Sequence, residues 1–132
     1  MPDFVYAEDD PMSREIMKFI LEYAMMAKNV AVFEDTANFM ERVQSLSFTP
    51  SVFLLDIHIE PHTGIEVLHM LKGHDTYSNI PVIALTASVM NEEIQNLKEV
   101  GFDGAIAKPV NVEVLPGLIN QILQGETVWH IS

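Results

Sequence analysis

Four of the five short apolar segments of this sequence lead into residues that could take part in chemistry. The first, 4–7, is followed by two acids, and the third, 51–55, leads directly into an aspartate. The fourth ends on a hydroxyl side chain, and the fifth is followed by a lysine. In chain order, the candidates are Glu8, Asp9, Asp56, Thr86 and Lys108. Their chemistry depends on whether the fold brings them together.

The acids among them would repel one another at close range. Carboxylates about 4 Å apart repel by roughly 4 kcal/mol per pair at an effective dielectric near 20. A hard divalent cation relieves this repulsion, and Mg²⁺ prefers a few carboxylates together with waters. Such a cation also binds phosphate oxygens, while Lys108 adds a positive charge and Thr86 a hydroxyl donor. The set is typical of phosphoryl transfer to a carboxylate, with Asp56 as the attacking group.

Alternating strands and helices are predicted to position these residues. Short apolar segments predict strands, and apolar residues at helical spacing predict helices. The expected strands are 4–7, 29–35, 51–56, 80–87 and 104–109. The expected helices are 11–26, 36–46, 64–71, 91–102 and one within 111–125 whose main part starts at Pro116. This order predicts an α/β fold with a doubly wound, five-stranded parallel sheet, whose sites form beyond the carboxyl ends of the strands.

Several further residues have predicted structural roles. Asp10 is suited to cap the first helix, with Pro11 as its first residue. Thr36 is the expected cap of the second helix. Trp129 is expected to pack back on the domain. For Phe19, Tyr23 and Met26, which lie off the apolar stripe of the first helix, burial by loops and a partner-docking patch both stay open.

The composition excludes several classes of protein. Seven Lys and Arg residues against 19 Asp and Glu give a net charge of −12, which argues against nucleic acid and anionic membranes as partners. There is no cysteine, so disulfides and thiolate metal sites are excluded. No window approaches the roughly 20 apolar residues of a membrane span, and the first residues are not expected to form a signal peptide. We expect a cytoplasmic protein with one domain over 1–126 and a short C-terminal tail, 127–132.

The motifs together resemble the receiver domain of bacterial response regulators. They are "AEDDPMSR", "FLLDIHIEPHTGIEVL", "IPVIALTA" and "GAIAKPV", and the resemblance covers residues 4–124. Thr86 follows Asp56 by 30 residues, and Lys108 follows Thr86 by 22. Each motif is weak by itself, but all four in this order and at these intervals are specific. The resemblance implies a flavodoxin-like sheet with the strand order 2-1-3-4-5.

The resemblance also implies a role for each candidate. Asp56 would be the phosphoacceptor of a Mg²⁺-dependent reaction. Glu8 and Asp9 would be the acid pair, and the metal site would consist of both, Asp56 and the main-chain carbonyl of His58. Thr86 would bond the phosphoryl group. Lys108 would pair with a phosphoryl oxygen, and its bond to Pro109 is expected to be cis.

The implied function is a signalling switch rather than an enzyme, apart from self-phosphorylation and self-dephosphorylation. The phosphodonor would be a sensor histidine kinase or a histidine phosphotransfer domain, and the output would pass to a downstream protein. One alternative is a phosphate shuttle within a hybrid kinase or phosphorelay. Another is a phosphatase that forms an aspartyl phosphate, although such an enzyme would want a carboxylate where His58 stands. A receiver-like scaffold that is never phosphorylated and self-association into a homodimer also stay open.

The sequence departs from the pattern of the family in three places. Ala105 stands where the family usually has Tyr or Phe as an aromatic switch, and an alanine has no ring to move. Glu60 stands where the family usually has Pro, with Pro61 one place later. No output domain is expected after the last helix. Coupling through Ala105 is therefore expected to be reduced, or carried by the loop after Thr86.

Overall fold

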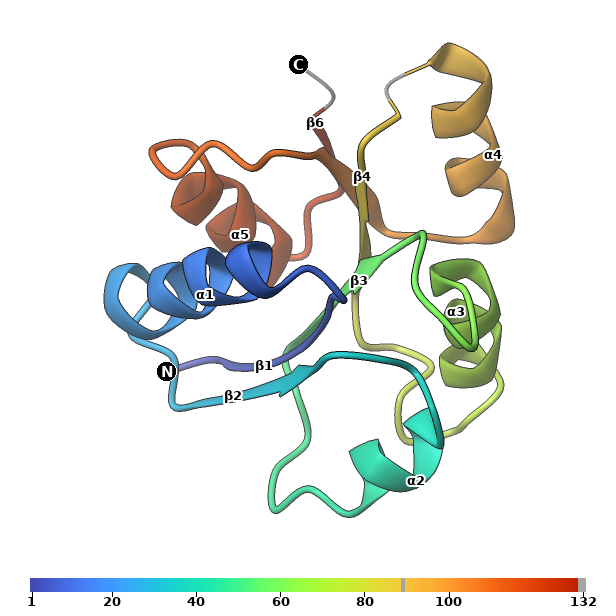
Figure 1. Cartoon of the computed structure of the whole chain (residues 1–132), viewed down its shortest axis with the longest axis horizontal. Coiled ribbons are helices and arrows are strands. Elements are labelled where there is room, and N and C mark those ends of the chain that lie inside the picture. The colour runs from blue at the N-terminus through green and yellow to red at the C-terminus, as the bar shows by residue number, and fades with distance from the viewer. Residues whose placement is uncertain (89, 131–132) are drawn as a thin grey trace.

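The computed structural model describes residues 1–88 and 90–130 and shows one parallel sheet between two layers of helices (Figure 1). The strands are β1 (Asp3–Ala7), β2 (Asn29–Phe33), β3 (Val52–Asp56), β4 (Val82–Thr86), β5 (Gly104–Ala107) and β6 (Val128–His130). The helices are α1 (Pro11–Phe19), its π-helical continuation η1 (Ile20–Ala24), α2 (Phe39–Gln44), α3 (Gly64–Lys72), α4 (Asn91–Val100) and α5 (Leu115–Leu123). None of the helices in these described residues is long and apolar enough to cross a membrane.

The strand order is β2-β1-β3-β4-β5-β6, and all neighbouring strands are parallel. The first five strands confirm the predicted order, whereas β6 is a strand that the prediction lacked. It lies within the segment expected as a tail, of which residues 131 and 132 are outside the described part. β6 pairs with β5, and Gly104 lets it approach because a Cβ there would meet the main chain of Val128.

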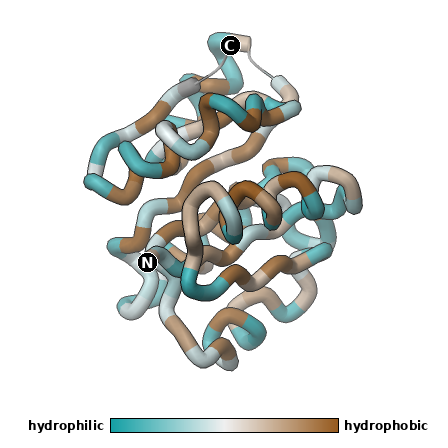
Figure 2. Tube along the Cα trace, turned by 90° about the vertical axis from the view of Figure 1, so that its left-hand side faces the viewer, coloured by the Kyte–Doolittle hydropathy of each residue, from teal (hydrophilic) through white to brown (hydrophobic). Residues whose placement is uncertain are grey.

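The core consists of two apolar clusters, one on each face of the sheet. Helices α2, α3 and α4 cover one face, and α1, η1 and α5 cover the other (Figure 1). Every residue of β3 and β4 is buried, as expected for strands covered on both faces. The helices show alternating brown and teal bands in Figure 2 because each turns an apolar stripe to the sheet and a polar one to water.

The first helix begins as predicted but ends differently. The Asp10 carboxylate accepts a hydrogen bond of 2.8 Å from the main-chain N–H of Ser13, and Pro11 is the first helical residue. Ser13 Oγ donates to the same carboxylate, and these bonds from Ser13 hold the pKa of Asp10 below its ordinary value. The regular α-helix ends at Phe19, and the chain continues as η1 rather than as α-helix to residue 26.

The predicted cap of the second helix was wrong. Helix α2 begins at Phe39, after Asn38 in a left-handed conformation, and Thr36 lies outside it. Thr36 is fully buried, and its hydroxyl donates to the carbonyl of His62 and accepts from the N–H of His62, both at 2.7 Å. The hydroxyl therefore ties the loop after β2 to the loop after β3.

Candidate functional site

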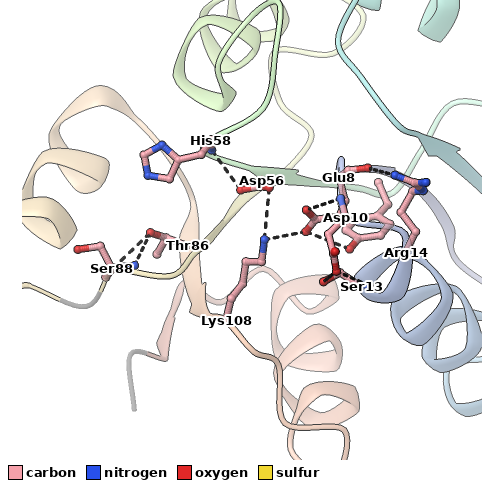
Figure 3. A network of polar contacts seen from close by, with 10 residues as sticks. Glu8, Asp10, Ser13, Arg14, Asp56, His58, Thr86, Ser88 and Lys108 are labelled. Atoms are coloured by element: carbon pink, nitrogen blue, oxygen red, sulfur yellow. Dashed lines mark hydrogen bonds and ion pairs between the residues drawn. The ribbon is translucent and has the colours of Figure 1, made fainter.

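The predicted site residues converge at the carboxyl ends of the central strands (Figure 3). Glu8 follows β1, Asp56 ends β3 and Lys108 follows β5. Strand β1 is paired with β3, so Glu8 and Asp56 lie at the ends of neighbouring strands although they are 48 positions apart in the sequence. Strand β3 is paired in turn with β4. The site is thus a product of the crossover order of the sheet, as the sequence predicted.

Asp56 is a buried carboxylate held by one hydrogen bond on each oxygen. Only 4% of the residue is exposed. Its Oδ1 accepts a bond of 3.1 Å from the main-chain N–H of His58, and its Oδ2 accepts one of 3.3 Å from Lys108 Nζ. The imidazole of His58 points away from Asp56 in Figure 3 and is exposed. These bonds fix the orientation of Asp56, while the proposed metal contact of the His58 carbonyl stays a prediction.

Lys108 joins Asp56 to a second buried carboxylate, Glu8. The Nζ of Lys108 lies 2.9 Å from Glu8 Oε1, and Glu8 is fully buried. Burial raises the pKa of Glu8, and the hydrogen-bonded Asp56 raises it further, although the bond from Lys108 opposes this. Burial would lower the pKa of Lys108, but the two carboxylates together raise it above its ordinary value. The lysine is therefore an internal counter-ion for both acids.

Asp9 adds a third carboxylate on the exposed side of the same cluster. Oxygens of Glu8, Asp9 and Asp56 all lie within 4.8 Å of one another. Lys108 partly neutralises the two buried acids, but Asp9 is exposed and adds negative charge. Three hard oxygen donors at this spacing suit Mg²⁺ in number and in kind. The residues present therefore fit the metal that the sequence predicted.

Thr86 lies at the end of β4, beside the site rather than bonded to it. Its hydroxyl donates to the carbonyl of Ser88 at 3.3 Å and accepts from the N–H of Ser88 at 3.1 Å. Only 3% of the residue is exposed. The hydroxyl thus closes a small turn in the loop after β4, and a bond from Thr86 to a phosphoryl group stays a prediction.

Two further residues support the acids, and sequence reasoning missed both. Arg14 Nη1 donates to the main-chain carbonyl of Glu8 at 3.0 Å, and the phenol of Tyr6 donates to Glu8 Oε1 at 3.4 Å. Arg14 could have been found because it lies one turn into the first helix, near the end of β1. Tyr6 could have been found because it is a polar aromatic residue in an otherwise apolar strand, two places before Glu8.

The loop after β3 is closed tightly around the main chain of Asp56. A Cβ at Gly64 would come within 2.7 Å of the carbonyl oxygen of Asp56, so that position tolerates no side chain without movement. The Lys108–Pro109 bond is cis, as the resemblance implied, and so is the bond between Glu60 and Pro61.

The face of β5 beside α4 combines Ala105 with a tryptophan. Ala105 is fully buried, and Trp129 of β6 is its direct neighbour in the register. Trp129 packs against the same cluster, and Lys98 Nζ of α4 lies 5.1 Å from the centre of its ring. The prediction that Trp129 packs back on the domain is confirmed. An aromatic ring thus lies beside Ala105, supplied by the added strand.

Three side chains that lie off the apolar stripe of the first helix are largely exposed. Phe19, Tyr23 and Met26 are each more than half exposed, and the rings of Phe19 and Tyr23 lie 4.9 Å apart. The loops therefore cover only a minor part of each side chain, and a partner-docking role for this patch stays a prediction.

Comparison with known proteins gives one family. The response regulator receiver domain family matches residues 4–120. The polar-differentiation response regulator DivK of Brucella anthropi is 36% identical over 63 residues, which are 48% of this chain and 51% of DivK. The chain spans about half the length of the first curated relatives that it matches.

Solved structures show the same fold. The chemotaxis response regulator CheY4 of Vibrio cholerae is 24% identical with a TM-score of 0.81, over 92% of this chain and 98% of that one. The receiver domain of a sensor histidine kinase of Pseudomonas aeruginosa PAO1, with a magnesium ion in its active-site cleft, is 19% identical with a TM-score of 0.76, over 94% and 95% of the chains. The chain belongs to the response regulator receiver domain family.

Proposed function

We propose that this receiver domain is switched by a phosphoryl group on Asp56. The observation that carries the proposal is a buried Asp56 carboxylate whose Oδ2 lies 3.3 Å from Lys108 Nζ, within a cluster of three acids. In the reaction, an oxygen of Asp56 bonds to phosphorus while the bond from phosphorus to the donor histidine nitrogen breaks. The nitrogen keeps the electron pair. Lys108 offsets the charge that spreads over the transferred oxygens.

Mg²⁺ is the cofactor that we propose for this step. Glu8, Asp9 and Asp56 would hold it, together with the main-chain carbonyl of His58. When bound, the ion supplies positive charge for the phosphoryl oxygens and relieves the repulsion among the acids. The magnesium in the related P. aeruginosa receiver domain supports this assignment. The chain's own contribution is to keep Asp56 oriented through the N–H of His58 and the ammonium of Lys108.

The phosphodonor we propose is a phosphohistidine on a histidine kinase or a phosphotransfer domain. An apolar groove of about 490 Å³ runs beside α1, lined by Ile16, Phe19, Ile20, Ala24 and Val112 with Glu15 at its edge. Ile16 also borders the cavity that reaches Lys108, so the groove leads toward the site. An amphipathic donor helix could bury its apolar side there. We place the exchange in the cytoplasm, where kinases have access to ATP.

The groove can be tested separately from the chemistry. Phe19→Glu puts a charge in the groove, so transfer from a phosphorylated protein donor should fall, while phosphorylation by acetyl phosphate should not change. Equal rates with the protein donor would exclude the groove as the docking surface.

A fluoroberyllate titration tests the proposed switch itself. Fluoroberyllate mimics a phosphoryl group on a carboxylate, so it should raise the melting temperature of the wild-type protein only when Mg²⁺ is also present. Asp56→Asn should abolish this response, and Lys108→Met should weaken it. A wild-type protein that shows no response would instead support a scaffold that is never phosphorylated.

A phosphate shuttle in a phosphorelay is the second candidate. It uses the same step on Asp56, followed by transfer from the acyl phosphate to another histidine. Rapid loss of the phosphoryl group to an added phosphotransfer domain would favour the shuttle, whereas retention would favour a switch that is read directly.

A further inference from the structure

Tyr6 places a phenol next to the acid cluster from inside the core. The residue lies in β1 and is 1% exposed. Residues two apart in an extended chain point to the same face, so Tyr6 and Glu8 can meet. The phenol oxygen lies 3.4 Å from Glu8 Oε1, which is long for a bond of this type. At present the nearer donor to that oxygen is Lys108 Nζ at 2.9 Å.

Lys108 and Tyr6 differ in whether they can move away from Glu8 Oε1. Lys108 also contacts Asp56, and a phosphoryl group on Asp56 would attract its ammonium toward the new oxygens. Tyr6 is fixed in a central strand and cannot follow. Among the described residues, Lys108 and Tyr6 are the side chains that donate to Glu8 Oε1, while Oε2 accepts only a main-chain bond of 3.3 Å from Asp10.

We propose that Tyr6 is a positioning residue for Glu8. Its phenol becomes the side-chain hydrogen-bond donor to Glu8 Oε1 when the ammonium of Lys108 moves to the phosphoryl group on Asp56. This inference rests on the proposed phosphorylation of Asp56. The phenol stays a donor throughout, because a tyrosine is protonated at neutral pH. A fully buried carboxylate without any side-chain donor would be costly, so a reserve donor has a physical purpose.

A small cavity makes this exchange possible. It has a volume of about 60 Å³ and is lined by Tyr6, Glu8, Ser13 and Lys108 together with apolar side chains of α1 and β4. The space gives the lysine room to move away from Glu8. It is also large enough for a few waters, which could replace part of the phenol's bond if the hydroxyl were removed. We therefore expect a moderate effect on metal binding rather than its complete loss.

The test compares Mg²⁺ binding by wild type and Tyr6→Phe with and without fluoroberyllate. Without it, Lys108 holds Glu8, and the two proteins should bind Mg²⁺ within about twofold of each other. With it, Tyr6→Phe should need about tenfold more Mg²⁺ for half-saturation, the size typical of losing a residue that orients a metal ligand. Calorimetry gives the first affinity, and melting temperature against Mg²⁺ gives the second.

Tyr77→Phe is the matched control. Tyr77 is 6% exposed and packs against Phe53 in the cluster on the other face of the sheet, away from the acids. It should show wild-type Mg²⁺ binding in both states. It also measures what the loss of a tyrosine hydroxyl away from the acids does to the metal-free melting temperature.

Each outcome bears on the inference. A penalty for Tyr6→Phe that appears only with fluoroberyllate supports it. Wild-type behaviour of Tyr6→Phe in both states, or an equal penalty in both, overturns it and leaves the proposed function intact. If the wild-type protein itself binds neither Mg²⁺ nor fluoroberyllate, the proposed function fails and this inference fails with it.

Discussion

Removal of the Asp9 charge should stabilise the metal-free protein and abolish most of its response to Mg²⁺. In Asp9→Asn, the side chain keeps its shape but no longer repels Glu8 and Asp56, whose oxygens lie within 4.8 Å of its own. Asp9 is exposed, so water screens these interactions strongly. At the dielectric of water, each pair at this distance repels by about 0.9 kcal/mol.

The two pairs set the expected size of the effect. Their repulsion is partly offset by Lys108, so we expect the free energy of unfolding to rise by about 1 kcal/mol. For a domain of this size, that corresponds to a melting temperature about 4 °C higher. In contrast, the wild-type protein should gain about 2.7 kcal/mol at a Mg²⁺ concentration 100 times its dissociation constant, because the ion binds the folded state only.

The assay is thermal unfolding at constant ionic strength, with Mg²⁺ replaced by Na⁺ in the reference. Asp75→Asn is the control, because it removes the same charge from an exposed acid in the loop after α3. It should leave the Mg²⁺ response unchanged. A lower metal-free melting temperature for Asp9→Asn, combined with a normal Mg²⁺ response, would refute the placement of Asp9 in the cluster.

Three further substitutions test other parts of the structure. Gly64→Ala brings a Cβ to 2.7 Å from the carbonyl oxygen of Asp56, so it should lower stability by about 1–3 kcal/mol and slow phosphorylation; unchanged kinetics would show that the loop adapts freely. Gly104→Ala brings a Cβ onto the main chain of β6, so Trp129 fluorescence should shift to the red, and an unshifted spectrum would contradict the pairing of β6 with β5. Asp10→Ala should lower the melting temperature above pH 4. Because the folded-state pKa of Asp10 is lowered, its contribution is lost as the pH falls through that value, so the two melting curves should converge in acid and a constant gap would count against the cap.

The order of the elements could be predicted because it depends on local patterns. Apolar runs such as 51–55 mark buried strands, and the cap of α1 needs only Asp10 and Pro11. The convergence of Glu8, Asp56 and Lys108 followed from the topology, since parallel strands end at one edge of the sheet. The sequence did not reveal that Lys108 bridges both acids, because this depends on side-chain conformation.

Long-range contacts account for the errors. Thr36 has the residue type of a cap, but a partner 26 residues away, His62, takes both of its hydrogen bonds. Strand β6 is three residues long, which is too short to show an alternating pattern. Its pairing with β5 depends on Gly104, which has no Cβ to meet the main chain of Val128. The same strand places Trp129 beside Ala105, so an aromatic ring is present at this face although the sequence of β5 lacks one.

The measurement that tests the account most directly is the intact mass of the protein after incubation with acetyl phosphate. With Mg²⁺, the wild-type protein should gain one phosphoryl group, which hydroxylamine should remove because it is an acyl phosphate. Without Mg²⁺, or with Asp56→Asn, no gain should occur. A phosphoryl group on the Asp56→Asn protein, or one on the wild-type protein that survives hydroxylamine, would contradict Asp56 as the acceptor.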